Sequence, residues 1–413
     1  MTLVIQKGRL IDGTGADPIA DATIVVEDNK IKAAGPTDQV NGPWGEDAQV
    51  IDAAGMTILP GFIDSHLHVL MEGFDLQRLI NTPFSLHFYQ GARHLRRTLE
   101  AGVTTVRDAG GADRGVKLAV EQGLIQGPRM LISIGPMSMT GGHGDHYMPS
   151  GVQVRLFPVY PGSPNTIVDG VDEVRKATRQ LLRDGADVIK MFTTGGVLSP
   201  SDQPEATQFT VEEIRVMVEE AHAHGKRTMS HAQGTQGIKN AVLAGVESIE
   251  HGIYLDDEVI DLMLERSTFL APTLVAPVGV LEQGEKTGTM PEWALDKTKR
   301  VLEVHKASIA RAHEAGVRIA MGTDSGVTPH GENLRELGLM VDIGMSPMEA
   351  IVASTKVAAE CLAMEDQIGT IEKDKLADVV LVQGDPLADI RVLENRENIA
   401  VVIKDGKIEV DRR

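Results

Sequence analysis

The organisation of this 413-residue chain is decided by the stretch Ile58-Leu59-Pro60-Gly61-Phe62-Ile63-Asp64-Ser65-His66-Leu67-His68. It is a largely apolar run that ends in two histidines, and such a run predicts a buried strand. Side chains at positions i and i+2 of a strand point to the same face. His66 and His68 are therefore both able to reach one metal ion.

Beyond this stretch, apolar segments alternate with helical patterns. Seven further strand candidates follow the first, at 104–108, 129–134, 187–191, 227–231, 247–251, 268–274 and 318–324. Several of the helices between them end on a glycine just before the next strand, as in Ala315-Gly316-Val317, which is the expected connection into a buried strand. Eight strands with intervening helices over residues 58–365 predict an α/β protein with a closed (β/α)8 TIM-type barrel. An open doubly wound sheet is the alternative, but no glycine-rich phosphate turn follows the first strand.

The two ends of the chain resemble each other and differ from the middle. Residues 1–57 and 366–413 alternate apolar and polar positions between turn signals, which is typical of short antiparallel strands. Asp405-Gly406 between two such segments predicts a hairpin. We therefore expect a small β-sandwich domain built from both chain ends.

The composition argues against several classes of partner. The formal net charge is −19 and no basic footprint exists to neutralise phosphates, so neither nucleic acid nor an anionic membrane is expected as a partner. The only cysteine, Cys361, lies in a helical pattern and predicts a small buried residue, so no disulfide or cysteine metal site is expected. No signal-peptide pattern and no apolar run of about 18 residues is present, which predicts a cytoplasmic location. The composition leaves open whether the protein forms a homo-oligomer.

Side chains of metal-ligand type stand where the predicted strands end, which is where a barrel places its catalytic groups. They are His66 and His68 at the first strand, and Lys190, His231, His251 and Asp324 at the fourth, fifth, sixth and eighth. A single histidine at a strand end is more often a hydrogen-bonded core residue. The joint placement of all six groups favours a metal site, and neutral imidazoles with a carboxylate suit Zn²⁺.

The lysine among these residues calls for its own explanation. A charged amine at the inner end of the apolar segment Val188-Ile189-Lys190-Met191 is costly to bury. Burial lowers the pKa of an amine, and a neutral amine can capture CO₂ to form a carbamate, whose two oxygens can bridge two cations. The alternative is a salt bridge from Lys190 to Asp324 or Glu250.

Together these residues resemble the signature of the amidohydrolase superfamily. The stretch 58–68 is similar to its opening motif, and the later ligand positions match in order, ending in Met321-Gly322-Thr323-Asp324. Thr140-Gly141-Gly142-His143-Gly144-Asp145 and Ile249-Glu250-His251-Gly252 resemble the imidazolonepropionase-related branch that includes Xaa-Pro dipeptidases.

The resemblance implies a binuclear centre of two divalent ions, with zinc as the expected metal. One ion would be held by His66, His68 and Asp324, and the other by His231 and His251. A carboxylated Lys190 and a hydroxide would bridge them.

We expect this centre to hydrolyse an amide C–N bond by attack of the metal-bridging hydroxide. Asp324 would accept the hydroxide proton and pass it to the departing amine, which is a poor leaving group without it. His143, flanked by glycines in a long loop, would donate to the carbonyl or the tetrahedral oxyanion, or else only structure the loop. Tyr254, three residues after His251, is a further candidate for a substrate contact.

Further segments and residues are candidates for roles around the site. The segments 138–170 and 195–208 are candidate lids, since long loops in compact domains are usually functional or disordered. Arg107 and Arg155 are candidates for binding a substrate carboxylate. The histidines in helical patterns are expected to face solvent; they are His87, His94, His222, His224, His305 and His313.

Three possible functions compete, and a fourth is disfavoured. The resemblance favours a dipeptidase of the Xaa-Pro type or a hydrolase of N-acyl amino acids resembling a carboxypeptidase, with a small-molecule amide or dipeptide as substrate. The alternative is a hydrolase of non-peptide amides, carbamates, ureas or lactams, including aryl amides. A deaminase is disfavoured, because such sites in this superfamily are generally mononuclear and lack the strand-four lysine. A non-catalytic scaffold is remote, because all six ligands are present.

Overall fold

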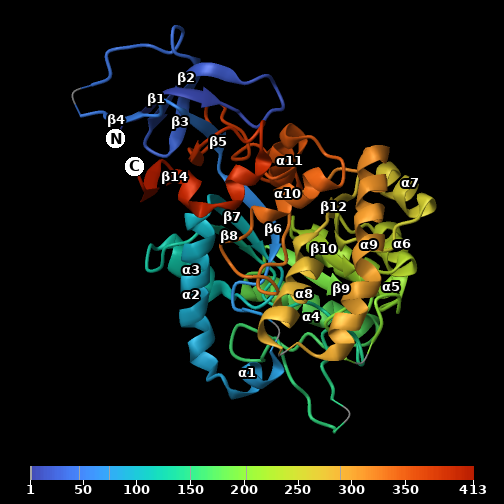
Figure 1. Cartoon of the computed structure of the whole chain (residues 1–413). Helices are drawn as coiled ribbons and strands as arrows, with labels where there is room; N and C mark the ends of the chain where they lie inside the picture. The colour runs from blue at the N-terminus through green and yellow to red at the C-terminus, as the bar shows by residue number, and fades with distance from the viewer. Residues whose placement is uncertain (1, 46, 74, 149, 201, 289) are drawn as a thin grey trace.

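The computed structural model describes residues 2–45, 47–73, 75–148, 150–200, 202–288 and 290–413. The chain is a mixed α/β protein, as the sequence predicted. Figure 1 shows the strands from the two chain ends together at the top of the molecule, above a larger part in which helices surround the remaining strands.

Strands from both ends of the chain form one eight-stranded sheet in the order β15-β14-β13-β5-β1-β2-β3, with β4 also paired to β1. Its strands are β1 (Thr2–Leu10), β2 (Ile19–Glu27), β3 (Lys30–Pro36), β4 (Gln49–Asp52), β5 (Met56–Pro60), β13 (Val379–Gln383), β14 (Ile399–Lys404) and β15 (Lys407–Asp411). The predicted hairpin is confirmed, because Asp405 and Gly406 both have positive φ angles, +50° and +72°, between β14 and β15. The sheet packs on its own cluster of buried aliphatic side chains. The domain limits 1–57, 58–365 and 366–413 stay a prediction.

The stretch 58–68 was predicted as one strand and is two. β5 ends at Pro60 in the terminal sheet, and β6 (Phe62–Leu67) begins the central strands. The break falls at Gly61, whose amide donates to the carbonyl of Asp378, 2.9 Å away. A Cβ at Gly61 would lie 2.1 Å from the hydroxyl oxygen of Thr104, so only glycine lets the chain pass here from one sheet to the other.

The central strands are parallel and form two groups. One sheet has the order β6-β7-β8 and the other β12-β11-β10-β9. These strands are β7 (Val103–Asp108), β8 (Arg129–Ile132), β9 (Val188–Phe192), β10 (Arg227–Ala232), β11 (Ser248–His251) and β12 (Phe269–Ala271). Isolated bridges join the groups at Met137↔Met191, Leu270↔Ile319 and Leu67↔Ser325.

The predicted eighth strand at 318–324 is wrong as a regular strand, although it lies where that strand was expected. Its backbone bonds to both neighbours, since the amide of Ala320 donates to Leu270 and the carbonyl of Met321 accepts from Ser65. The extended conformation stops at Asp324, whose φ is +58°. Among the described residues the strand pairing therefore gives two sheets linked by bridges, not one closed sheet.

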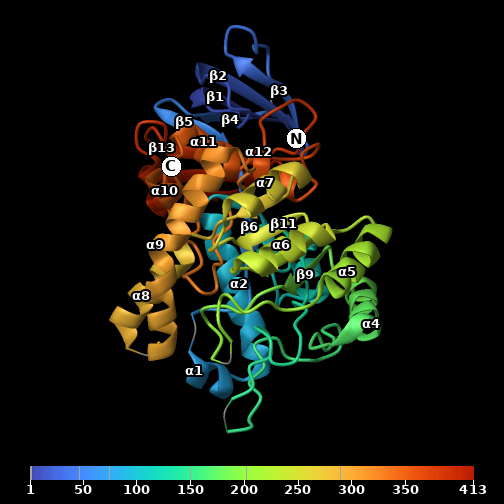
Figure 2. The ribbon, with the colours of Figure 1, turned by 90° about the vertical axis from the view of Figure 1, so that its right-hand side faces the viewer.

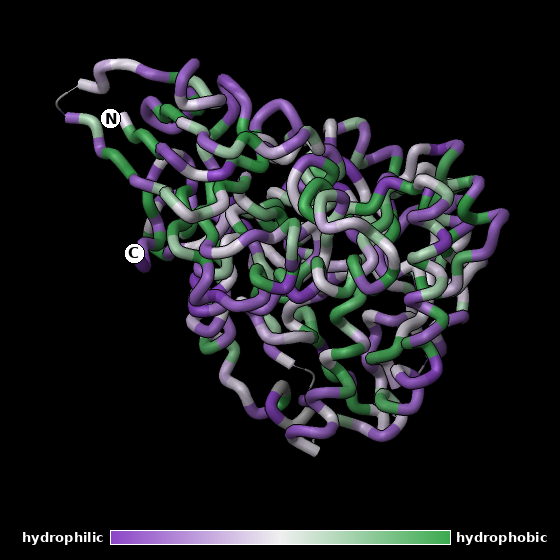
Figure 3. The backbone as a smooth tube through the Cα atoms, turned by 45° about the horizontal axis from the view of Figure 1, so that its top comes forward, coloured by the Kyte–Doolittle hydropathy of each residue, from purple (hydrophilic) through white to green (hydrophobic). Residues whose placement is uncertain are grey.

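Helices cover the central strands on the outside (Figure 2). They are α1 (Leu76–Asn81), α2 (Phe84–Glu100), α3 (Arg114–Glu121), α4 (Gly170–Asp184), α5 (Val211–Ala223), α6 (Thr235–Ala244), α7 (Asp257–Arg266), α8 (Val275–Thr287), α9 (Glu292–Ala315), α10 (Arg335–Asp342), α11 (Pro347–Ala353) and α12 (Lys356–Cys361). The predicted glycine stop is confirmed at Gly316, which ends α9 with a φ of +93°. Figure 3 shows hydrophobic stretches running through the interior and hydrophilic ones along the outer turns. Cys361 is buried at the end of α12, as predicted.

Apart from Gly170, where α4 begins, the two candidate lids contain no helix or strand in their described parts; Pro149 and Ser201 within them lie outside the described residues. Across the described ranges, every helix is too short or too polar to span a membrane.

Candidate metal centre

All six predicted ligands line one cavity, which we call the metal cavity. It has about 860 Å³ of empty space including its mouth. His66 comes from β6, Lys190 from β9, His231 from β10 and His251 from β11. His68 and Asp324 lie just beyond β6 and in the bridge segment beside it. The tertiary structure thus brings together residues that are up to 258 positions apart in the sequence, counting from His66 to Asp324.

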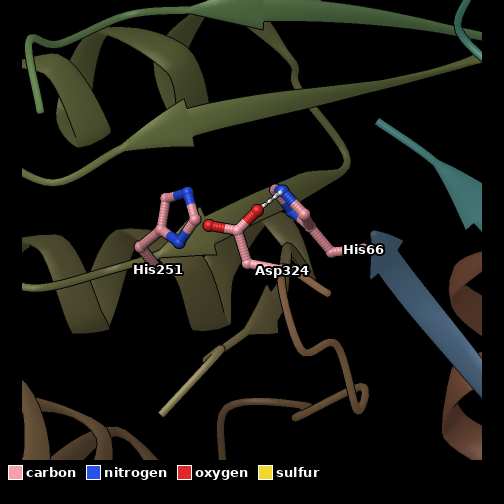
Figure 4. Close-up of side chains that lie close together, drawn as sticks. All are labelled: His66, His251 and Asp324. Carbon is pink, nitrogen blue, oxygen red and sulfur yellow. Dashed lines mark ion pairs between the residues drawn. The ribbon is translucent and has the colours of Figure 1, made fainter. Parts of the chain in front are cut away.

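Asp324 lies at the centre of the group. Its Oδ1 is 3.5 Å from Nε2 of His66 and 3.3 Å from Nε2 of His68. Ligand atoms of His66, His251 and Asp324 all lie within 4.8 Å of one another, which is close enough for one cation. Figure 4 shows the Asp324 carboxylate between the two rings, with one oxygen turned toward His66. Asp324 therefore lies near predicted ligands of both metal ions: His66 and His68 for one ion, and His251 for the other. The resemblance had assigned Asp324 to the first ion alone.

Each histidine keeps one ring nitrogen in a hydrogen bond and leaves the other for the cavity. Nδ1 of His68 donates to the carbonyl of Gly110 at 3.0 Å, and Nδ1 of His251 lies 2.7 Å from the hydroxyl of Thr273. Nε2 of His231 donates to the carbonyl of Gly195 at 3.0 Å. Such bonds set the tautomer and orientation of metal-binding histidines in proteins.

His66 has a different partner, which sequence reasoning gave no such role. Its Nδ1 is 2.7 Å from Oε2 of Glu250, and Oε1 of Glu250 accepts from Nη2 of Arg107 at 3.0 Å. Arg107 also donates to the carbonyl of Ser65, so its guanidinium is used behind the centre and not in binding a substrate carboxylate. The available signal was the position of Glu250 directly before His251 on a strand, which turns its side chain away from that of His251.

The Lys190 amine is the least satisfied group of the centre. Its side chain is fully buried, and Nζ has no hydrogen-bond partner among the described residues. Burial lowers the pKa of Lys190 to about 8, although the charges of Glu250 and Asp324 act in the opposite direction. The predicted alternative, a salt bridge to Asp324 or Glu250, is not formed in the part of the chain that the structure describes.

The protonation of His231, His251 and Asp324 suits cation binding. Burial holds the pKa of His231 and of His251 well below the usual range, so both rings are neutral. Burial alone would raise the pKa of Asp324, but hydrogen bonds from His66 and His68 hold it well below its usual range. The two neutral imidazoles and the ionised carboxylate, around a buried amine with no hydrogen-bond partner among the described residues, form a donor set that fits divalent cations and a carboxylated lysine.

Two of these residues have strained backbones. His251 has a φ of +73° and Asp324 a φ of +58°, a region that residues other than glycine seldom adopt. Such strain persists where the surrounding structure requires it, and it concentrates at functional sites. Here it turns the two side chains out of the strand direction and toward each other (Figure 4).

His143 lies in the same cavity, as its predicted role requires. Its ring stacks on that of His231 with centroids 4.3 Å apart, and its Nδ1 is 3.5 Å from a carboxylate oxygen of Asp202. A Cβ at Gly196 would lie 2.3 Å from the His143 ring. The segment that contains Asp202 and Gly196 is fastened by Lys297 of α9, whose buried amine donates to the carbonyls of both. The sequence offered no sign of this lysine.

Some predicted residues lie elsewhere. Tyr254 is not among the residues that line the cavity, and its hydroxyl interacts with Glu205. Its role as a substrate contact stays a prediction. Arg155 lines a second, adjoining cavity and donates to Asn165.

Two helical histidines that were expected to face solvent are buried. The ring of His305 lines the metal cavity and donates from Nε2 to the carbonyl of His251 at 2.8 Å. His94 donates from Nδ1 to the carbonyl of Val69 and stacks on His330. The expectation was wrong because both rings satisfy backbone carbonyls at or beside predicted metal ligands, which a helical pattern does not reveal.

The chain is similar to known proteins over nearly its whole length. Residues 57–408 match the amidohydrolase family. The chain is 34% identical to ochratoxinase of Aspergillus niger over 98% of this chain and 86% of that protein. It is 36% identical to a crystal structure of a Xaa-Pro dipeptidase with methionine bound in the active site, with a TM-score of 0.89 and 99% of each chain covered. It is 34% identical to a prolidase in complex with N-methylphosphonate-L-proline, with a TM-score of 0.91 over the whole of both chains.

The chain therefore belongs to the amidohydrolase family, and the resemblance seen in the sequence is confirmed. Its structural relatives include dipeptidases of the Xaa-Pro type, in agreement with the predicted branch.

Proposed function

We propose that this protein is a binuclear, metal-dependent hydrolase of amide C–N bonds in small molecules, with a dipeptide of the Xaa-Pro type or an N-acyl amino acid as substrate. The observation that carries the proposal is the Lys190 amine, which is buried among four imidazoles and a carboxylate and has no hydrogen-bond partner in the described part of the chain. A buried group of this kind costs free energy unless something absent from the polypeptide satisfies it. The names of the prolidase and dipeptidase relatives support the substrate class.

Two zinc ions and a carbamate on Lys190 would satisfy the whole set. His66, His68 and Asp324 would hold one ion, and His231 and His251 the other. A carbamate needs an amine that is neutral for part of the time, and a pKa of about 8 provides this near neutral pH. We also propose that the two linked parallel sheets correspond to a (β/α)8 barrel, in which the six ligands stand at the carboxyl ends of the strands.

When bound, the two ions supply a Lewis acid for the amide carbonyl and lower the pKa of a water molecule. Asp324 accepts a proton from the attacking water and passes it to the departing nitrogen, because its carboxylate is ionised and lies within 3.5 Å of two of the ligand rings. His143 donates a hydrogen bond to the carbonyl oxygen, held in place by Asp202 and by its stacking on His231.

A second candidate is a hydrolase of non-peptide amides, such as aryl amides. The metal cavity favours it because much of its wall is aliphatic, with Val197, Leu198, Ile253 and Val280 among the lining residues. The similarity to ochratoxinase also supports a substrate other than a dipeptide.

The test is a metal analysis and an activity screen of the purified, zinc-supplemented protein. The screen covers Xaa-Pro and Xaa-Arg dipeptides, N-acyl amino acids, aryl amides and carbamates. We expect two ions per chain and cleavage of dipeptides or N-acyl amino acids. Cleavage of aryl amides and carbamates alone would replace the first candidate by the second.

The Lys190→Ala variant tests the bridging role. It should retain fewer than two ions and lose activity by about a thousandfold, whereas Lys306→Ala, a change on the surface of α9, should match the parent protein. One ion per chain in the parent, with Lys190→Ala fully active, would overturn the two-metal proposal.

A further inference from the structure

A second cavity adjoins the metal cavity and is larger, with about 1210 Å³ of empty space including its mouth. The two cavities share three wall residues, Met71, Leu156 and Phe157. The Phe157 ring lies with its centroid 5.9 Å from that of His68, a predicted metal ligand. We call this second space the outer cavity. Because Phe157 in its wall lies beside His68, the outer cavity begins next to the predicted metal centre.

Aromatic side chains are concentrated around the outer cavity. The chain has only 8 phenylalanines and 4 tyrosines in 413 residues. Three of the phenylalanines and one of the tyrosines line this space: Phe84, Phe88, Phe157 and Tyr160. The chain is poor in aromatic residues, and the cores of the protein consist mainly of aliphatic side chains. The concentration of aromatic rings around the outer cavity therefore indicates a function for them there.

The aromatic rings contact one another at their edges. Phe84 and Tyr160 have centroids 4.9 Å apart and Phe84 and Phe88 5.3 Å apart, both in edge-to-face orientation. Phe84 nevertheless remains 46% exposed, so it does not complete a hydrophobic core. An exposed apolar group beside a cavity commonly marks a ligand site, because burying it on binding releases water from its surface.

The position of the cavity in the fold supports the same conclusion. Its wall comes from the start of α2, the turn after His68 and the segment around Phe157 and Tyr160. Figure 1 places α1 and the start of α2 at the lower end of the molecule, away from the terminal sheet. The aliphatic residues of the metal cavity come instead from α8, α9 and the segment around Val197, so different elements of the fold supply the apolar walls of the two cavities.

We propose that the outer cavity is a substrate subsite that binds an aromatic substituent on one side of the scissile amide. The proposal rests on the proposed function, because it takes the metal cavity as the place of hydrolysis. Ring faces of the substrate would stack against Phe84 and Phe157, and aromatic pairs of this kind strengthen binding beyond the area that they bury. The enzyme would then prefer an amide with an aryl group over the same amide with a methyl group.

The kinetic test compares three substrates in the zinc-loaded protein: N-acetyl-L-alanine, N-(2-naphthoyl)-L-alanine and N-acetyl-L-(2-naphthyl)alanine. The second and third add an aromatic group on the acyl side and on the amine side of the same bond. In Phe84→Ala, kcat/KM should fall about tenfold for one of the two aromatic substrates and stay within about twofold for N-acetyl-L-alanine. Phe84→Leu, which keeps an apolar side chain, should give a smaller loss in the same substrate.

Tyr89→Ala is the matched control. Tyr89 lies on the same helix and is 75% exposed, but it does not line the outer cavity. Its removal should change none of the three rates by more than about twofold. Equal losses for all substrates in Phe84→Ala, or equal effects of Phe84→Ala and Tyr89→Ala, would overturn the subsite.

A binding measurement separates this proposal from the proposed function. Calorimetry of 2-naphthamide with the zinc-loaded protein should give a dissociation constant about tenfold weaker in Phe84→Ala than in Tyr89→Ala. This outcome with no hydrolysis of any amide would refute the proposed function and retain the aromatic site. Hydrolysis with equal binding by both variants would retain the function and refute the site.

Discussion

Glu250 and Arg107 form a buried ion pair behind the predicted metal ligands. Both side chains are buried, their charged groups lie 3.0 Å apart, and the second oxygen of Glu250 holds His66. Glu250→Gln keeps the shape of the side chain but removes its charge. Arg107 is then a buried cation without a charge partner, and breaking a buried pair in this way typically costs about 3–5 kcal/mol.

The pKa of Glu250 gives a second route to the same magnitude. Burial raises it, but the charge of Arg107 and the hydrogen bond from His66 lower it further, from an ordinary value of 4.5 to about 2. Because the pKa is lower in the folded state, the carboxylate stabilises the fold above pH 4.5, and this contribution is lost as the pH falls from about 4.5 toward 2. The difference corresponds to about 3 kcal/mol.

The assay is urea unfolding of the metal-free protein at pH 7 and at a series of lower pH values, with zinc affinity measured separately at pH 7. Glu250→Gln should lower the free energy of unfolding by about 3 kcal/mol at pH 7, and the deficit should shrink toward pH 2. Its metal affinity should fall about tenfold or more, because His66 loses the group that orients it. Glu265→Gln, which removes an exposed carboxylate beside Arg266, should change stability by less than about 0.5 kcal/mol. A loss below about 1 kcal/mol in Glu250→Gln, with an unchanged pH dependence, would refute this reasoning.

Three further predictions concern the residues around the centre. Thr273→Val removes the hydroxyl that contacts His251 and should weaken metal binding about tenfold by equilibrium dialysis while costing only about 1 kcal/mol in stability; unchanged affinity would contradict the contact. Burial raises the pKa of Glu336 to about 8, so its contribution to stability is complete below about pH 4.5 and is lost as the pH rises toward 8; the stability difference between the parent and Glu336→Gln should shrink over this range, and a difference that grows with pH would show the sign to be wrong. Gly196→Ala places a methyl group against the His143 ring and should lower kcat more than it raises KM, with a melting temperature close to that of the parent; normal kcat would argue against a role of His143 in catalysis.

How far the sequence predicts this protein is clear from particular elements. Regular local patterns were sufficient to predict most strands of the terminal sheet and of the central parallel sheets. They also predicted the glycine that ends α9 and the hairpin at Asp405-Gly406. The prediction failed where the structure depends on a contact between residues that are far apart in the sequence. Gly61 breaks an apparently continuous strand because its neighbour in space is Thr104, 43 positions away.

The same limit applies to the site. The residue types and their places at strand ends identified all six residues that the structure brings into one cavity. The sequence did not indicate that Arg107 supports Glu250 instead of a substrate, that His305 supports the backbone of His251, or that Lys297 fastens the segment beside His143. Each of these residues lies in a helix or strand pattern that is equally compatible with a surface or core role.

What the sequence by itself determined is which side chains form the candidate centre, because the periodicity of the chain places histidines, a lysine and an aspartate at the ends of predicted strands. Only the tertiary structure decided which groups support those ligands, how Asp324 stands between them, and that aromatic side chains gather beside them. The physical reason is the range of the forces involved. Strand and helix periodicity is a property of neighbouring residues, whereas burial of a charge, a hydrogen bond to a distant carbonyl and the shape of a cavity depend on segments that meet only after folding.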